Sequence, residues 1–255
     1  MFLVLGDMVY RKSNLEFAAA SVENMMMSAQ LMLLLCILLA AFTLPNAAIF
    51  SVHPASILLI VTYIFTVKLL VDTHDKPMWL PRMSQGTIKD GSAHMAKKVK
   101  GRRSTLIVGF AGCAFMVGFS GWLIARSGME IVNRSGMSSG VMGGIFIAVS
   151  TSLPELIIAI TAVRMGALTL AVGDIVGGNA FDTLFVAVSD IFYREGSIYQ
   201  AITGQAQIWL STAMSMNALL LLGLMYRERK GFANIGMESS AILIVYVSTV
   251  AYLCI

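Results

Sequence analysis

Residues 150 to 182 read STSLPELIIAITAVRMGALTLAVGDIVGGNAFD, and this stretch places polar side chains inside an apolar sequence long enough to cross a bilayer. Its acids and amides include Glu155, Asp174, Asn179 and Asp182. An ionisable side chain at bilayer depth is costly, so it usually faces a partner, a cavity or an ion pathway. The stretch therefore predicts a membrane protein that handles ions.

The composition of the chain favours the same class. Of its 255 residues, 57% are hydrophobic and 13% are charged. A soluble domain of this length would need a more polar surface, so we expect an all-α polytopic membrane protein. The first apolar run does not predict a signal peptide, because Asp7 and Arg11 interrupt it and no basic region precedes it.

A membrane-spanning helix needs about 20 mainly apolar residues. On this criterion the sequence predicts seven spans, with residues 1–10 as the last turns of an eighth. Pro154 is the one proline inside a predicted span. The predicted spans are 25–45, 55–71, 104–125, 137–163, 168–192, 206–225 and 237–255.

Basic residues gather between the second and third predicted spans. Residues 72–103 carry eight Lys or Arg and three Asp. Cytoplasmic loops carry an excess of Lys and Arg, so we expect this segment in the cytoplasm. Alternation then places fourteen basic residues inside and three outside, with loops at 126–136 and 194–205 and the C-terminus outside. A patch for anionic lipid is an alternative interpretation of the segment, and the net charge of +4 does not indicate a nucleic-acid partner.

The isolated cysteines and histidines do not indicate a metal or disulfide site. We expect the cysteines to be small core residues and the histidines to lie in solvated connecting segments. These residues are Cys36, Cys113 and Cys254, and His53, His74 and His94.

The chain also resembles itself at an offset of 183 residues. FLVLGDMVYRKSNLE at 2–16 aligns with FVAVSDIFYREGSIY at 185–199, and the shared D-x-x-Y-R places Asp7 opposite Asp190. Farther on, SILLIV at 56–61 matches SAILIV at 240–245. The predicted orientation puts the two copies on opposite sides, so the repeat is inverted, which is an architecture of transporters.

The repeat predicts three parts. Residues 1–71 would be the end of a first five-helix unit, 72–103 a cytoplasmic loop, and 104–255 a second complete unit. We expect about 80 residues of the first unit to be absent, by extrapolating the 183-residue offset. A natural single-repeat protein that pairs with a second copy is the alternative.

Polar side chains cluster around Pro154. Thr151, Ser152 and Glu155 have the spacing of one helix face. Pro154 has no N–H and would free the carbonyl of Ser150. A carbonyl, hydroxyls and a carboxylate suit a hard cation such as Ca²⁺ or Na⁺. A proline kink satisfied by Ser and Thr would explain the hydroxyls but not the carboxylate.

The next predicted helix carries Asp174, Gly178 and Asp182 one turn apart, with Asn179 between them. Two GxxxG patterns, 140–144 and 173–177, allow close helix packing. Close packing would bring Glu155 within reach of Asp182 and Asn179 at a shared ion site. The alternative is that these glycines serve packing alone.

The stretch from Gly144 to Leu184 resembles the second α-repeat of the cation/calcium antiporters, the sodium/calcium exchanger superfamily. Residues 151–155, TSLPE, resemble its TS-x-PE core, and 173–182, GDIVGGNAFD, resemble its G-[ND]-x-x-GSN-x-x-[ND] core. Residues 1–71 resemble the end of the first repeat. The resemblance implies ten helices, alternating-access antiport and ion ligands from both repeats, in a bacterial inner membrane.

The same resemblance assigns roles to five residues. Glu155 matches the principal Ca²⁺ carboxylate, and Thr151 and Ser152 match backbone and hydroxyl ligands. Asn179 matches a coordinating amide, and Asp182 matches the polar residue one turn later. At two further positions the chain departs from the family pattern: Gly178 replaces a serine, and Asp174 stands where asparagine is more common.

The leading hypothesis is therefore a secondary antiporter, without an organic cofactor, that exchanges Ca²⁺ for Na⁺ or H⁺. Ser150, Asp174 and Gly178 are additional candidates for the ion site. A second hypothesis is a non-transporting half-module that needs a second copy or another chain. A third is an intramembrane aspartyl protease using Asp174 and Asp182, but both acids lie on one predicted helix and the G-x-G-D motif is absent. We therefore expect no enzyme.

Overall fold

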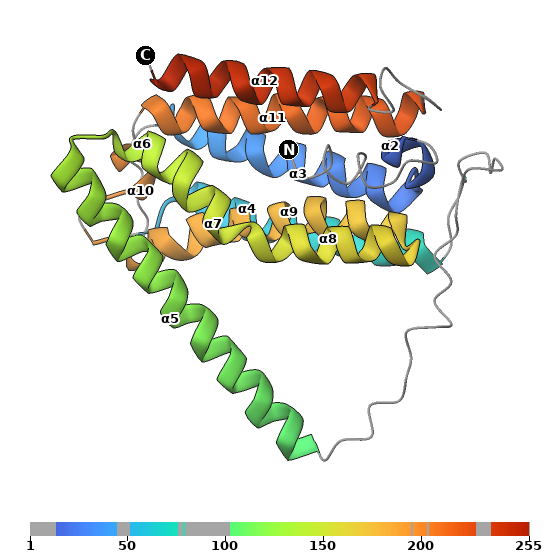
Figure 1. The fold of residues 1–255 in the computed structure, drawn as a ribbon, viewed down its shortest axis with the longest axis horizontal. Coiled ribbons are helices and arrows are strands. Elements are labelled where there is room, and N and C mark those ends of the chain that lie inside the picture. Colours follow the sequence, from blue (N-terminus) through green and yellow to red (C-terminus); the bar gives the residue numbers. More distant parts are fainter. Residues whose placement is uncertain are drawn as a thin grey trace. The chain divides into compact units, whose positions relative to one another are not determined.

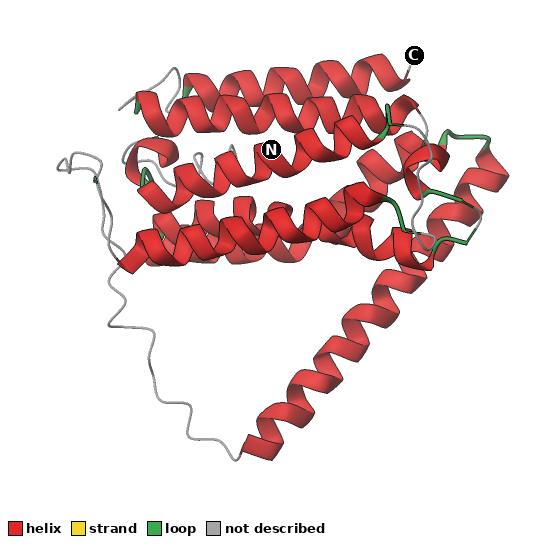
Figure 2. Ribbon diagram, turned by 180° about the vertical axis from the view of Figure 1, so that it is seen from behind, coloured by secondary structure: helices red, strands yellow, loops and turns green. Residues whose placement is uncertain are grey.

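The computed structural model describes residues 14–44, 52–75, 79, 103–194, 196–202, 204–227 and 236–254. Within these residues the chain forms helices and no β-strand (Figure 2). This confirms the predicted all-α class. The predicted remnant at 1–10 and nearly all of the loop at 72–103 lie outside the described residues.

The helices follow one another with short connections. They are α2 (Leu15–Ala18), α3 (Val22–Ala41), α4 (Pro54–Asp75), α5 (Arg103–Ser135), α6 (Ser139–Val141), the π-helix η1 (Met142–Ile147), α7 (Ala148–Thr151), α8 (Leu153–Met165), α9 (Leu168–Phe192), α10 (Ile198–Ala201), α11 (Gly204–Tyr226) and α12 (Met237–Cys254).

Two compact units make up the chain, and the first comprises residues 1–90 and 155–253. Its centre is α3, which packs against α4, α9 and α11 (Figure 1). Leucine, alanine and valine side chains form the core because these helices offer apolar residues to each other. Next to α11 lies α12, where Thr212 Oγ1 and Thr249 Oγ1 are 2.9 Å apart. This unit holds Glu155 and all of α9.

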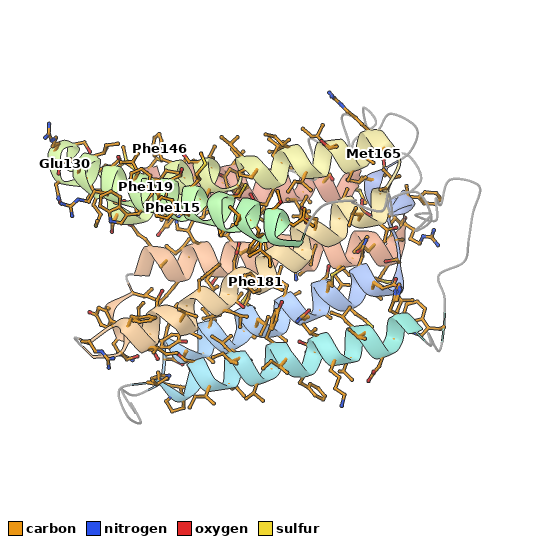
Figure 3. The ribbon with its side chains drawn as sticks, turned by 90° about the horizontal axis from the view of Figure 1, so that it is seen from below. Phe115, Phe119, Glu130, Phe146, Met165 and Phe181 are labelled. Atoms are coloured by element: carbon orange, nitrogen blue, oxygen red, sulfur yellow. The ribbon has the colours of Figure 1, made fainter. Side chains whose placement is uncertain are left out.

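The second unit comprises residues 91–154 and Cys254. Its long helix α5 packs against η1, and Ile147 approaches Gly128 so closely that a Cβ on Gly128 would lie 2.8 Å from its Cδ1. The rest of α5 is exposed and apolar. Phe115 and Phe119 follow one another along it with their ring centroids 6.5 Å apart (Figure 3). An exposed apolar helix of this length is what a lipid environment requires.

Among the described residues, six helices are long and apolar enough to cross a membrane: α3, α4, α5, α9, α11 and α12. The pair Ser139–Thr151 and Leu153–Met165 passes the same test together. These helices correspond to the seven predicted spans. The predicted span at 168–192 coincides with α9, and the other ends differ mostly by a few residues.

Two predictions about α5 and its successor are wrong. Residues 126–135 are not a loop, because α5 continues to Ser135. Within this part of the helix, Arg134 Nε pairs with Glu130 Oε1 at 2.6 Å, one turn apart. The span at 137–163 is not continuous either: it contains η1 and breaks at Ser152. Pro154 is therefore the second residue of α8, where a proline is tolerated, rather than inside a long helix.

The predicted surroundings of two residue types are also wrong. All three cysteines are free and exposed on membrane-length helices rather than in the core. His53 is 1% exposed instead of solvated, because it precedes α4 and lies within the first unit. His74 is exposed as expected, and His94 lies outside the described residues.

The helix bounds match the internal repeat. Short helix α2 begins at Leu15 and short helix α10 at Ile198, while α4 begins at Pro54 and α12 at Met237. Both pairs of starting points are 183 residues apart, the offset of the sequence match. A short helix and two long ones therefore recur in the same order, although the resemblance of the two sequences is limited to a few residues.

Candidate functional site

Three of the candidate residues lie at the end of α7 in the second unit. Ser150 Oγ donates to the carbonyl oxygen of Phe146 at 2.8 Å, and Thr151 Oγ1 donates to that of Ile147 at 3.0 Å. Both side chains are exposed, and Ser152 is half-buried. A hydroxyl that donates its hydrogen to the backbone keeps its oxygen lone pairs, so these oxygens could still bind a cation.

The chain leaves the helical path at Ser152. This residue caps α7 with φ −94° and ψ 1°, and its N–H donates to the carbonyl oxygen of Ala148. Leu153 then starts α8. The π-helix just before this break adds a second irregularity, and such turns are frequent at functional sites. The break explains why hydroxyl groups and the Glu155 carboxylate follow one another in so apolar a sequence.

Glu155 lies in the first turn of α8, in the first unit. A carboxylate in this position is favoured by the positive end of the helix. The side chain is exposed. Whether the hydroxyls of the preceding helix face the same ion as Glu155 stays a prediction from the sequence.

A tight turn carries the chain from α8 to α9. Gly166 adopts a φ of +78°, and the N–H groups of Gly166 and Ala167 donate to the carbonyl oxygens of Val163 and Ala162. This pattern ends a helix and needs a residue without a Cβ at the position with positive φ. The α9 helix can therefore begin at Leu168, three residues after α8 ends, and return along the first unit.

The second set of candidates lies on α9. Asn179 and Asp182 are exposed, and Gly178 is half-buried with no heavy atom within 4 Å of a Cβ built on it. Asp182 lies close enough to Glu155 for the two carboxylates to interact electrostatically. The structure thus brings together the two acids that the sequence analysis paired. Two like charges that interact in an apolar environment favour a bound cation.

Asp174 occupies a different position on the same helix. Its side chain is half-buried, and its Oδ2 is buried with no hydrogen-bond partner among the described residues. The preceding residue, Gly173, faces α3: a Cβ there would lie 3.0 Å from Met27 Cε and 3.1 Å from Asn24 Oδ1. Asp174 is therefore beside the α3 contact, two turns before Asp182.

The glycines of α9 do not pack against the helix that carries Glu155, as close packing at the ion site would require. Gly173 and Gly177 contact α3 through Met27, so this GxxxG pattern brings α9 to α3 rather than to α8. Small residues of this kind let helix backbones approach closely. They fix the side of α9 that faces the core, and Asn179 and Asp182 are exposed because they lie outside that side.

These residues offer two carboxylates, an amide and hydroxyl groups, all of them oxygen donors that suit a hard cation. Within the described residues no group of three or more His, Cys, Asp and Glu side chains could hold a metal ion. A cation bound by these carboxylates would therefore need neutral oxygens among its ligands.

Comparison with known protein families identifies the family of this chain. Residues 105–255 match the family described as sodium/calcium exchanger protein. The chain belongs to the sodium/calcium exchanger family. The match covers more than half of the chain and includes every candidate residue. Members of this family are transporters and not enzymes, and the chain is an integral membrane protein.

Individual relatives are similar over shorter segments. A protein of Alkalimonas amylolytica named as an antiporter, CaxA, is 33% identical over 105 residues, which are 41% of this chain and 32% of that protein. Inner membrane protein YrbG of Escherichia coli is 39% identical over 64 residues, 25% of this chain and 20% of its own length. The sodium/calcium exchanger MaX1 of Methanosarcina acetivorans is 37% identical over 59 residues, 23% of this chain and 17% of its own.

The matched segments therefore span less than a third of the length of these relatives. No solved structure matches the chain. The family is established by residues 105–255 as a whole rather than by a single relative.

Proposed function

We propose that this protein takes part in secondary transport of cations across a membrane, exchanging Ca²⁺ for Na⁺ or H⁺ by alternating access. The observation that carries the proposal is the electrostatic interaction of two carboxylates, Glu155 and Asp182, on two helices of the family-matching segment. Membership of a transporter family supports cation transport in general. The choice of Ca²⁺ rests on the all-oxygen donor set.

The site would take its ligands from two turns of the chain. Glu155, Asp182 and Asn179 would provide two carboxylates and an amide oxygen. Thr151 and Ser152 would provide hydroxyl or backbone oxygens from the turn just before Glu155. Ser150, Asp174 and Gly178 are further candidates, although the position of Asp174 beside α3 favours a role in packing.

A bound ion would need additional ligands. Ca²⁺ takes six to eight oxygens, and the exposed position of Glu155, Asn179 and Asp182 leaves one side of the ion open. A second copy of the chain, or another chain, would complete the shell. A non-transporting half-module that needs such a partner is the alternative function raised by the sequence analysis.

The experiment that tests the proposal measures ⁴⁵Ca²⁺ uptake by the purified protein in proteoliposomes. An outward Na⁺ gradient, a pH gradient and no gradient are compared, and the mass of the species is determined in detergent. Acceleration by one gradient identifies the coupling ion. Failure to bind or transport Ca²⁺ in every species, including assemblies with a second chain, would contradict the proposal.

A further inference from the structure

Asp190 is a buried acid that the candidate ion site does not use. It lies in the last turn of α9, eight residues beyond Asp182, and its exposure is 0%. The internal repeat singled it out, because it is the aspartate of the D-x-x-Y-R match. A carboxylate in an apolar bundle is costly unless its oxygens are hydrogen-bonded.

Both oxygens of Asp190 accept hydrogen bonds from other elements. Its Oδ2 accepts from the backbone N–H of His53 at 2.7 Å and from the Ser56 hydroxyl at 2.8 Å. Its Oδ1 accepts from the backbone N–H of Ile198 at 3.3 Å. The carboxylate thereby links the end of α9 to the first turn of α4 and to the first residue of α10.

The start of α4 suits an anion. Pro54 is the first residue of this helix and has no N–H, and the N–H of Ala55 donates to His53 Nδ1 at 3.2 Å. The backbone N–H of Ser56 donates to the carbonyl oxygen of His53, while the His53 N–H and the Ser56 hydroxyl donate to Asp190. Negative charge is stabilised at the positive end of a helix. Asp190 therefore ties the start of α4 to the end of α9.

A second layer of contacts fixes the Ser56 hydroxyl. Ser56 Oγ and Tyr199 Oη are 2.9 Å apart. Ser56 has a single hydroxyl hydrogen, which it gives to Asp190, so the Tyr199 hydroxyl must be the donor in this pair. Tyr199 is 1% exposed and its ring lies 5.0 Å from that of His53. Each of these groups is buried, and each orients the next.

We propose that Asp190 is a positioning residue for the candidate cation site. By binding the start of α4 and α10, it fixes the position of α9 along its own helix axis, and with it the positions of Asn179 and Asp182. This inference rests on the proposed function. Near its other end α9 accepts one hydrogen bond, from Asn24 Nδ2 to the carbonyl oxygen of Thr169 at 3.2 Å. Its contacts with α3 in between are mostly apolar and glycine contacts, which resist separation but are not directional. Directional hydrogen bonds at one end of an uninterrupted helix set its position along its own axis.

An asparagine could not replace Asp190. Either orientation of the amide would turn its NH₂ group toward N–H or O–H donors, because both carboxylate oxygens are acceptors. Asp190→Asn should therefore break at least one side of the link while preserving size. Ser56→Ala breaks one contact from the other helix and leaves α9 itself unchanged. Ser189→Ala, at an exposed neighbour on α9, is the matched control.

The test measures Ca²⁺ binding by calorimetry, and separately the melting temperature, on the purified full chain. We expect Asp190→Asn to weaken Ca²⁺ binding about tenfold, in line with the loss of hydrogen bonds to a charged group. Ser56→Ala should weaken it less, and the double variant should be little worse than Asp190→Asn. Ser189→Ala should bind as the wild type does.

The outcomes separate this inference from the proposed function. A lower melting temperature with unchanged Ca²⁺ affinity in Asp190→Asn would show a merely structural residue and overturn the inference. If Asp190→Asn does not fold, Ser56→Ala decides in the same way, since unchanged affinity there also overturns it. Absence of Ca²⁺ binding by the wild type, alone and with a second chain, would overturn the proposed function and this inference with it.

Discussion

At the scale of single residues, the charge of Glu155 is the feature on which the proposed site depends most. Glu155→Gln keeps the size of the side chain but removes the charge. We expect Ca²⁺ affinity to fall about tenfold or more, because oxygen sites for Ca²⁺ are tuned by the number of charged ligands. Calorimetry on the purified chain measures this, and exchange should be lost with expression near normal.

The chain offers a matched control for this change. Glu130 is exposed on α5, where it pairs with Arg134. Glu130→Gln should leave Ca²⁺ affinity unchanged, since an exposed ion pair of this kind contributes little. Equal affinity in wild type and Glu155→Gln would remove Glu155 from the site.

The buried hydroxyl of Tyr199 makes the protein less stable at high pH. Burial raises the pKa of its hydroxyl from 10.0 to about 12, with a further increase from the charge of Asp190. An unfolded chain would ionise at about 10. The contribution of Tyr199 to the free energy of unfolding is therefore complete below pH 10 and is lost as the pH rises through 12. It amounts to about 2–3 kcal/mol.

Unfolding in denaturant between pH 9 and pH 12 measures this effect. Between pH 9 and pH 12 the free energy of unfolding should fall by about 2–3 kcal/mol less in Tyr199→Phe than in the wild type. Tyr252→Phe is the control, because Tyr252 is 67% exposed on α12. The same pH profile in Tyr199→Phe and wild type would contradict the assignment of the raised pKa.

Residue-level features were predictable from the sequence only when they lay close together in it. A short turn connects the helices of Glu155 and Asp182, so the sequence predicts that the two acids share an ion site, and this stays a prediction. The contact of His53 with Asp190 was not predicted, because 137 residues separate them. One signal was present: proline directly after His53 marks the first turn of a helix, where a buried partner for the free N–H groups is useful.

At the scale of helices, the contact of α9 with α3 depends on the absence of a side chain at Gly173. Gly173→Leu should destabilise the protein by about 1–3 kcal/mol, as overpacking usually does, because Met27 and Asn24 occupy the space. Gly178→Leu is the control on the same helix, with no heavy atom near a Cβ. Thermal unfolding in detergent compares the two, and equal stability would contradict the packing assigned to Gly173.

Helix positions were predicted well because apolar length is a strong signal in a membrane protein. The span at 168–192 coincides with α9. The errors have local causes. The end of α5 was placed too early because Arg126 and Arg134 indicate a loop by charge, although Glu130 at the intervening turn stabilises a helix. The break at Ser152 was missed because proline was assigned to a helix interior rather than to a first turn.

At the scale of the whole molecule, the distribution of basic residues predicts the orientation. We expect the C-terminus outside, with residues 72–103 in the cytoplasm. Cys254 is free and exposed at the end of α12, so it reports on this directly. In a variant lacking Cys36 and Cys113, a membrane-impermeant maleimide should label intact spheroplasts. Labelling only after lysis would reverse the orientation.

The exposure of the candidate ligands leads to a prediction about assembly. Because Glu155, Asn179 and Asp182 are all exposed, we expect gradient-driven Ca²⁺ exchange only from a species that contains a second chain. Uptake into proteoliposomes is compared with the mass of the reconstituted species. Robust exchange by a monomer would contradict this expectation, while exchange by a dimer of the chain would support it.

The hydrogen-bond order around Asp190 has a consequence for protons. A proton relay requires every member to accept a proton on one side and release one on the other. Here Tyr199 donates to Ser56 and Ser56 donates to Asp190, while the other two donors are backbone N–H groups that do not give up their hydrogens. The chain of bonds ends at the carboxylate. These hydrogen bonds therefore do not form a path along which protons could move.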